Sequence, residues 1–151
     1  ATGNASPVSV PAKGKYMFVD FKRFADAYGV PLSPNPNFPI ITITLMRMLT
    51  GLQMRNDPRV QGFMDTIFKA IWVDALNLND PEIVSSVLER DHFDPTEMNA
   101  LANDQATKDR LKDVTTEAID RGVFGAPTFF VKDEMFWGQD RIEQLKIALL
   151  S

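Results

Sequence analysis

The sequence has 151 residues, with no cysteine and a single histidine, His92. The absence of cysteine excludes disulfide bonds, thiolate catalysis and cysteine-based metal sites, and it is compatible with a cytoplasmic protein. A zinc site normally takes three or four cysteine, histidine or carboxylate ligands, so one histidine argues against a zinc enzyme. His92 stands in a polar, aspartate-rich segment, where we expect an exposed loop residue and not the base of a catalytic triad.

Long apolar runs and an excess of positive charge are also missing. No uninterrupted apolar stretch approaches the roughly 20 residues that cross a bilayer, so we expect no membrane partner. Residues 1–10 lack the charged and apolar regions of a secretory signal. The net charge is -4 and the pI about 4.9, which argues against a nucleic-acid partner. The apolar share of 44% and the charged share of 24% are those of an ordinary globular domain.

The sequence of the first half of the chain predicts helices separated by proline-containing segments. Residues 1–14 are rich in glycine and proline and predict an ordered loop. A helix is predicted over Lys15–Tyr28, with Gly29 as its stop. Four prolines within residues 30–39 predict an extended connector, and a further helix should begin at about Thr42.

Three Asp-Pro pairs, Asp57-Pro58, Asp80-Pro81 and Asp94-Pro95, predict helices that begin near residues 58, 81 and 95. In each pair the carboxylate can cap the helix, and proline suits the first helical position. The first of these helices should run to about Leu76, and Glu97 could complete a capping box with Asp94. Another helix is expected over about Asp104–Arg121.

The last thirty residues change in character. Thr128–Val131 and Met135–Trp137 predict two short strands joined by a turn, followed by an amphipathic helix. Two strands do not make an independently stable sheet, so the hairpin must pack on helices or on further strands. Met46, Met48, Met54 and Met64 suggest core or adaptable pocket lining, Trp72 helix-packing core, and Phe136 and Trp137 hairpin core or pocket wall.

Two motifs resemble a known family. The first is residues 122–131 (GVFGAPTFFV) with residues 135–141 (MFWGQDR), and the second is Gly3-Asn4 followed by residues 11–14 (PAKG), Tyr16, Asp20 and Arg23. Together they resemble the thioredoxin-like proteins that include 2-hydroxychromene-2-carboxylate isomerases and kappa-class glutathione transferases.

The resemblance implies an α/β thioredoxin-like fold with a large all-helical insertion, this chain being mostly helical with a C-terminal β-hairpin. Residues 1–14 would form an active-site loop, residues 15–121 the helical insertion, and residues 122–151 the C-terminal part with a cis-proline, the hairpin and the last helix. The family's first strand, helix and second strand find no match in this sequence. We therefore expect the chain to lack the family's catalytic serine, so that no catalytic residue is assigned and this chain alone would be inactive.

The resemblance also implies a glutathione site. Ala126 and Pro127 would present backbone to the cysteinyl part of glutathione, and Asp140 with Gln139 would face its γ-glutamyl end, although an Asp at this position could act only as a helix cap. Lys13 would pair with a glutathione carboxylate, and Asn4 would hydrogen-bond within the site. A lone loop lysine can equally be a solvated surface residue.

The implied function is an enzyme, a glutathione-dependent cis-trans isomerase acting on a small aromatic substrate in aromatic-compound degradation, as a cytoplasmic homodimer. One alternative is a kappa-like glutathione transferase or peroxidase on the same scaffold. Another is a non-catalytic fragment or binding module. A disulfide oxidoreductase of this fold is disfavoured because its chemistry needs a Cys-x-x-Cys pair.

Overall fold

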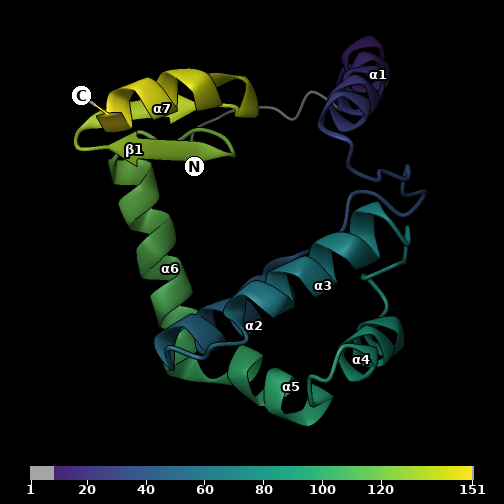
Figure 1. Cartoon of the computed structure of the whole chain (residues 1–151). Helices are drawn as coiled ribbons and strands as arrows, with labels where there is room; N and C mark the ends of the chain where they lie inside the picture. The colour runs from purple at the N-terminus through teal and green to yellow at the C-terminus, as the bar shows by residue number, and fades with distance from the viewer. Residues whose placement is uncertain (1–8, 151) are drawn as a thin grey trace. The chain divides into compact units, whose positions relative to one another are not determined.

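The computed structural model describes residues 9–150, which fall into two compact units, residues 9–113 and 114–150. The first unit contains the helices α1 (Pro11–Tyr28), α2 (Ile43–Met54), α3 (Val60–Trp72), α4 (Pro81–Arg90) and α5 (Pro95–Asn103). Helix α6 (Gln105–Asp120) includes the boundary between the units. The second unit continues with strands β1 (Thr128–Val131) and β2 (Glu134–Trp137), the short 3-10 turn η2 (Gln139–Arg141) and helix α7 (Ile142–Leu150) (Figure 1).

Most helix ends follow the capping signals in the sequence. Gly29 ends α1 in the left-handed conformation, with φ 65°. The carboxylates of Asp80 and Asp94 accept hydrogen bonds from the backbone N–H groups of Glu82 and Thr96, so α4 and α5 begin at the predicted prolines. Helix α1 begins at Pro11, four residues earlier than predicted.

Helix α3 differs at both ends from the predicted 58–76. The Asp57 carboxylate accepts the backbone N–H of Arg59 at 2.8 Å, but the Asp57 carbonyl accepts the N–H of Val60, three residues on, so residues 57–59 form a turn and the helix begins at Val60. At the other end, Ala75 has a φ of 53° and the Leu76 N–H bonds back to the Ala70 carbonyl, so the helix stops at Trp72.

The core of the helical unit lies among α2, α3, α4 and α5 (Figure 1). Helices α2 and α5 approach closely, because Gly51 has no side chain and the space beside it is filled by Leu101. The fully buried side chains at the centre are Met48, Leu52, Phe63, Leu88 and Met98. In the part of the chain that the structure describes, no helix is long and apolar enough to span a membrane.

The hairpin unit is small. Strands β1 and β2 pair antiparallel from Thr128 opposite Trp137 to Val131 opposite Glu134, and α7 packs on β1 (Figure 1). Phe136 is buried as predicted, and the Arg121 guanidinium lies 3.6 Å from the centre of the Phe130 ring. The predicted mostly helical chain with a C-terminal hairpin is therefore confirmed.

A cluster of four charged side chains joins the turn after α2 to α5. Arg59 lies between the carboxylates of Asp57 and Glu97, at 2.7 and 3.0 Å, and Arg55 lies 3.6 Å from Glu97. Glu97 is thus engaged with arginines, and the predicted capping box with Asp94 is wrong. Hydrogen bonds from the Arg59 side chain and backbone lower the pKa of Asp57 to about 2.

This shift predicts an acid-sensitive contribution to stability. The folded-state pKa of Asp57 lies below its ordinary value of 3.8, so below about pH 4 the unfolded chain binds the proton first. The stabilisation is present at neutral pH and should be lost as the pH falls from about 4 to 2. Asp57→Asn should lower the urea midpoint at pH 7, and its deficit should shrink towards pH 2. Asp65→Asn, which removes an exposed carboxylate from α3, serves as the control; equal pH profiles for the two variants would contradict this role of Asp57.

Candidate functional site

Four of the six predicted site residues meet at one end of the β-hairpin. The Ala126–Pro127 peptide bond is cis, as predicted, and it leads directly into β1. Because Thr128 pairs with Trp137, the segment before β1 and the segment after β2 emerge together. The backbone N–H of Gly138 donates to the carbonyl of Pro127 at 3.0 Å. Ala126 and Pro127 are therefore held beside the turn that carries Gln139 and Asp140.

Asp140 places a carboxylate on this turn. Its side chain is 51% exposed, and Oδ2 accepts a hydrogen bond from Nη1 of Arg141 at 2.7 Å. Gly138 has φ 101°, and a Cβ built on it would lie 2.5 Å from Oδ1 of Asp140. Glycine thus allows the carboxylate to lie against the turn, half open to solvent, with one arginine partner.

Trp137 forms a wall beside the cis bond. Its ring centre is 5.0 Å from that of Phe124, and a Cβ on Gly125 would lie 2.6 Å from the indole Nε1. The side chain is 50% exposed, so Trp137 is not hairpin core. The missing side chain of Gly125 lets the indole reach the backbone that precedes Ala126.

The backbone at Ala126 is open. Ala126 and Pro127 are exposed, and the Thr128 hydroxyl donates to the carbonyl of Gly125 at 2.6 Å. Within residues 9–150 no hydrogen bond is recorded for the N–H or C=O of Ala126. An exposed backbone donor and acceptor on an extended segment can pair with an added peptide strand.

The remaining two predicted residues, Lys13 and Asn4, lie outside the described part of the hairpin unit. Lys13 lies in the first turn of α1, in the helical unit, and not in a loop as predicted; its side chain is exposed. Asn4 lies outside the described residues. The parts that Lys13 and Asn4 play in the site stay predictions. His92 is exposed in a turn, as expected, and among residues 9–150 no three histidine, aspartate or glutamate side chains cluster as metal ligands would.

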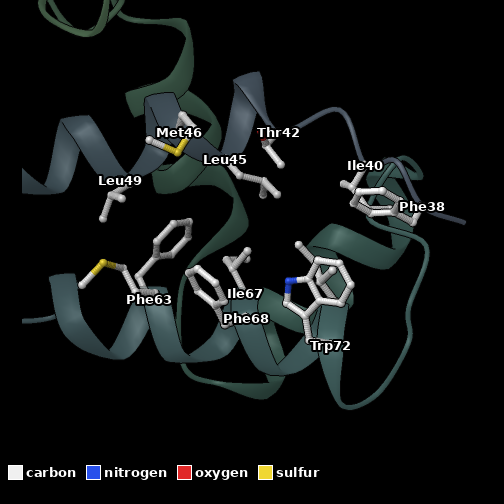
Figure 2. Close-up of a pocket in the computed structure, with 12 residues that line it drawn as sticks. Phe38, Ile40, Thr42, Leu45, Met46, Leu49, Phe63, Ile67, Phe68 and Trp72 are labelled. Atoms are coloured by element: carbon white, nitrogen blue, oxygen red, sulfur yellow. The ribbon is translucent and has the colours of Figure 1, made fainter. Parts of the chain in front are cut away.

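The helical unit holds an apolar cleft that the sequence did not reveal. It has a volume of about 210 Å³ and lies between α2, α3 and the segment before α2. Figure 2 shows Leu45 and Leu49 of α2 facing Phe63 and Ile67 of α3 across it. The lining residues are Phe38, Ile40, Thr42, Leu45, Met46, Leu49, Phe63, Met64, Ile67, Phe68, Ile71 and Trp72.

The methionines, predicted as core or adaptable pocket lining, divide between these two environments and the surface. Met46 and Met64 line it as adaptable side chains, whereas Met48 is core and Met54 is exposed on the surface. Trp72, expected in the core, is half-buried in the cleft wall.

The hairpin end, with its cis-proline and adjacent Asp turn, is the arrangement that the resemblance implied. Residues 1–150 match the DSBA-like thioredoxin domain. The chain belongs to this family. The fold class predicted from the two motifs is thereby confirmed.

Relatives of this DSBA-like chain carry two kinds of name. It is 32% identical to the 2-hydroxychromene-2-carboxylate isomerase of Pseudomonas sp. (strain C18), over 99% of this chain and 69% of that protein. It is 29% identical to the isomerase of the same name from Pseudomonas putida, over 99% and 72%. Glutathione S-transferase kappa 1 of Rattus norvegicus is 26% identical, over 98% and 71%.

A solved structure supports the same assignment. A 2-hydroxychromene-2-carboxylate isomerase superposes on this DSBA-like chain with a TM-score of 0.79 and 28% identity, covering 97% of this chain and 70% of that one. The resemblance drawn from the two sequence motifs is therefore confirmed at the level of the family, and the similar proteins are named as isomerases and transferases.

Proposed function

We propose that the chain takes part in glutathione-dependent cis-trans isomerisation of a small aromatic substrate, and that glutathione binds at the end of the β-hairpin. The observation that carries the proposal is the Gly138–Pro127 hydrogen bond, since it places the open backbone of Ala126 beside the carboxylate of Asp140. Relatives named 2-hydroxychromene-2-carboxylate isomerase and glutathione S-transferase kappa 1, of which this chain spans 72% and 71%, support both halves of it.

The residues at the hairpin end fit the chemistry of glutathione. Glutathione is an extended peptide whose backbone can pair with the N–H and C=O of Ala126 as an added strand does. Its γ-glutamyl end carries an ammonium group, for which the half-exposed Asp140 carboxylate is a charge-matched partner. Arg141 donates a hydrogen bond to the same carboxylate and orients it, and Trp137 provides an apolar surface beside it.

When bound, glutathione would supply a thiolate that adds reversibly to a conjugated double bond, so that the bond can rotate before the thiolate leaves. The role of this chain is to bind and orient glutathione, which carries the thiol. No residue here is assigned the task of lowering the thiol pKa. The homodimer and the cytoplasmic location implied by the family also stay predictions.

The first test is a glutathione titration of the Trp72→Phe variant, in which Trp137 is the sole indole. Trp137 fluorescence should respond saturably, because the indole lies beside the proposed backbone site. Asp140→Ala should raise the glutathione Kd about fivefold, the range expected for one partly exposed charged hydrogen bond. Asp133→Ala is the matched control, since it removes an exposed carboxylate from the opposite end of the same hairpin. Absence of any response from a folded chain, or equal effects of the two alanines, would refute the site.

Lys13 can be tested in the same titration against a close neighbour. Lys13 and Lys15 are both exposed in the first turns of α1. If Lys13 pairs with a glutathione carboxylate, Lys13→Ala should weaken binding several-fold and Lys15→Ala should not. Equal affinities of the two variants for glutathione would show that Lys13 does not bind glutathione. The conclusion about Asp140 would not change.

A kappa-like transferase is the second candidate, favoured by the match to the kappa transferase of Rattus norvegicus. The two activities differ in their products: a transferase retains the glutathione–substrate bond, whereas an isomerase releases the thiol. We expect this chain alone to be inactive, and turnover by the glutathione-bound chain would contradict that expectation. In that case, conversion of 2-hydroxychromene-2-carboxylate without thiol consumption would support the isomerase. Consumption of thiol by 1-chloro-2,4-dinitrobenzene alone would support the transferase.

A further inference from the structure

The wall of the cleft between α2 and α3 is fixed by hydrogen bonds and not by apolar packing alone. The segment before α2 carries Phe38 and Ile40, and it is fastened to the end of α3 by the buried Asn35. Asn79 holds the same segment from the other side, because its Oδ1 accepts the N–H of Ile41 at 2.8 Å. Ser33 adds a bond from its N–H to the carbonyl of Trp72 at 2.7 Å. The cleft is therefore preformed.

The lining of the cleft disfavours charged ligands. Eleven of its twelve side chains are apolar, with Thr42 the single polar one, and none of the twelve is charged. An ionised ligand would lose its hydration without gaining a partner, which is costly. An uncharged ligand meets no such penalty and gains from leaving water.

The aromatic side chains of the cleft favour a planar ligand. Phe38 and Trp72 lie with ring centres 5.5 Å apart at 44°, and Phe63 forms part of the floor. Phe68 stands at the mouth with 65% of its surface exposed, an unusual position for a phenylalanine without a partner in the described chain. Rings of this kind contact a further ring edge-to-face or offset-stacked.

The size of the cleft limits the ligand. An apolar cavity of about 150 Å³ accommodates benzene. At about 210 Å³ this cleft has room for one substituted ring or two fused rings. Met46 and Met64 at its edge can adjust to the outline of such a ligand.

We propose that the cleft between α2 and α3 is a binding site for a small, uncharged aromatic molecule. All residues that line the cleft belong to the helical unit, whereas the proposed glutathione site belongs to the hairpin unit. It goes beyond the proposed isomerase function, because the substrate in the names of the relatives is a carboxylate and this cleft offers that group no partner.

The test uses the full chain carrying Trp137→Phe, so that the only indole N–H resonance belongs to Trp72. Toluene and benzoate are the probes, since they share a ring and differ in charge. Toluene should shift the Trp72 indole resonance saturably at concentrations below about 1 mM, as expected for a ligand of this size. Benzoate should shift it at least tenfold more weakly. No saturable shift up to the solubility limit of toluene, or an equal response to benzoate, would overturn the proposal.

Two variants tie the binding to this cleft. Phe68→Ala removes a ring at the mouth and should weaken toluene binding at least fivefold, without unfolding the chain, because that side chain is largely exposed. Tyr28→Ala removes another largely exposed ring of the same unit that does not line the cleft, and it should leave the affinity unchanged. If the indole shift instead followed protein concentration and dimer formation in sedimentation, the cleft would be a surface for a second copy and the proposal would fail. Glutathione binding is measured by Trp137 fluorescence in the Trp72→Phe variant. The proposal for the cleft and the proposal for the glutathione site can therefore be refuted separately.

Discussion

Replacing Gly51 by alanine will lower the free energy of unfolding by about 2 kcal/mol, although alanine is the better helix former. A Cβ on Gly51 would lie 2.9 Å from both Cβ and Cδ2 of Leu101, and the Leu101 Cβ cannot rotate away. Such overpacking of a tight core costs about 1–3 kcal/mol. Because two atoms are too close, we take the upper part of this range, from which helix propensity subtracts about 1 kcal/mol.

The control for this prediction is Gly62, a glycine of α3 whose added Cβ would meet no atom within 4 Å. Gly62→Ala should stabilise the chain by roughly 0.5–1 kcal/mol through helix propensity alone. Opposite signs for the two substitutions in urea denaturation would locate the close approach of α2 and α5 at Gly51. A stabilising Gly51→Ala would show that α5 can move away without cost.

Helix ends were predictable where the signal is local. At Asp80 and Asp94 the carboxylate accepts an N–H two residues ahead, so a pair of adjacent residues decides where the helix begins. At Asp57 the carboxylate accepts the same kind of bond from Arg59, but the Asp57 carbonyl accepts the N–H of Val60, three residues on and not four, so this pair opens a turn and not the helix. Glu97, whose partner is 38 residues away, could not be assigned from spacing at all.

The candidate site was predictable only through family resemblance. Composition and periodicity suggested a strand at Thr128–Val131 and a possible cap at Asp140. They gave no reason to join Ala126 to Asp140, because the Gly138–Pro127 bond depends on the register of the hairpin. The part assigned to Lys13 rested on a loop that proved to be the first turn of a helix.

The cleft escaped prediction for a different physical reason. A helix with apolar residues on one face signals burial, but it does not say whether the facing helix closes on it or leaves space. Here one side of α2 packs closely against α5 at Gly51. The non-helical segment before α2, which Asn35 and Asn79 hold by hydrogen bonds, forms one wall of the cleft. Asn35, between two prolines, reads from sequence as a turn residue, and its two carbonyl partners lie 36 and 41 residues away.

Replacing Asn35 by alanine should therefore cost about 2–3 kcal/mol of unfolding free energy. The Asn35 side chain is buried and donates from Nδ2 to the carbonyls of Ile71 and Leu76 at 3.0 and 2.9 Å, while its Oδ1 accepts the N–H of Asn37. Leu76 keeps a second partner in the N–H of Leu78, so the carbonyl of Ile71 is the group left unsatisfied. A buried unsatisfied group costs about 1–3 kcal/mol, to which the lost Asn37 bond adds.

Two further variants separate the hydrogen bonds of Asn35 from its volume. Asn35→Asp keeps the shape and the acceptor for Asn37 but turns a carboxylate towards two carbonyl oxygens, so it should destabilise more than alanine at pH 7. Asn37→Ala changes a half-buried side chain of the same segment that makes no recorded bond, and it should stay within about 0.5 kcal/mol of the parent. Urea denaturation followed by Trp72 fluorescence in the Trp137→Phe chain measures all three. If aspartate proved milder than alanine, volume and not hydrogen bonding would hold this segment, and the preformed wall of the cleft would lose its basis.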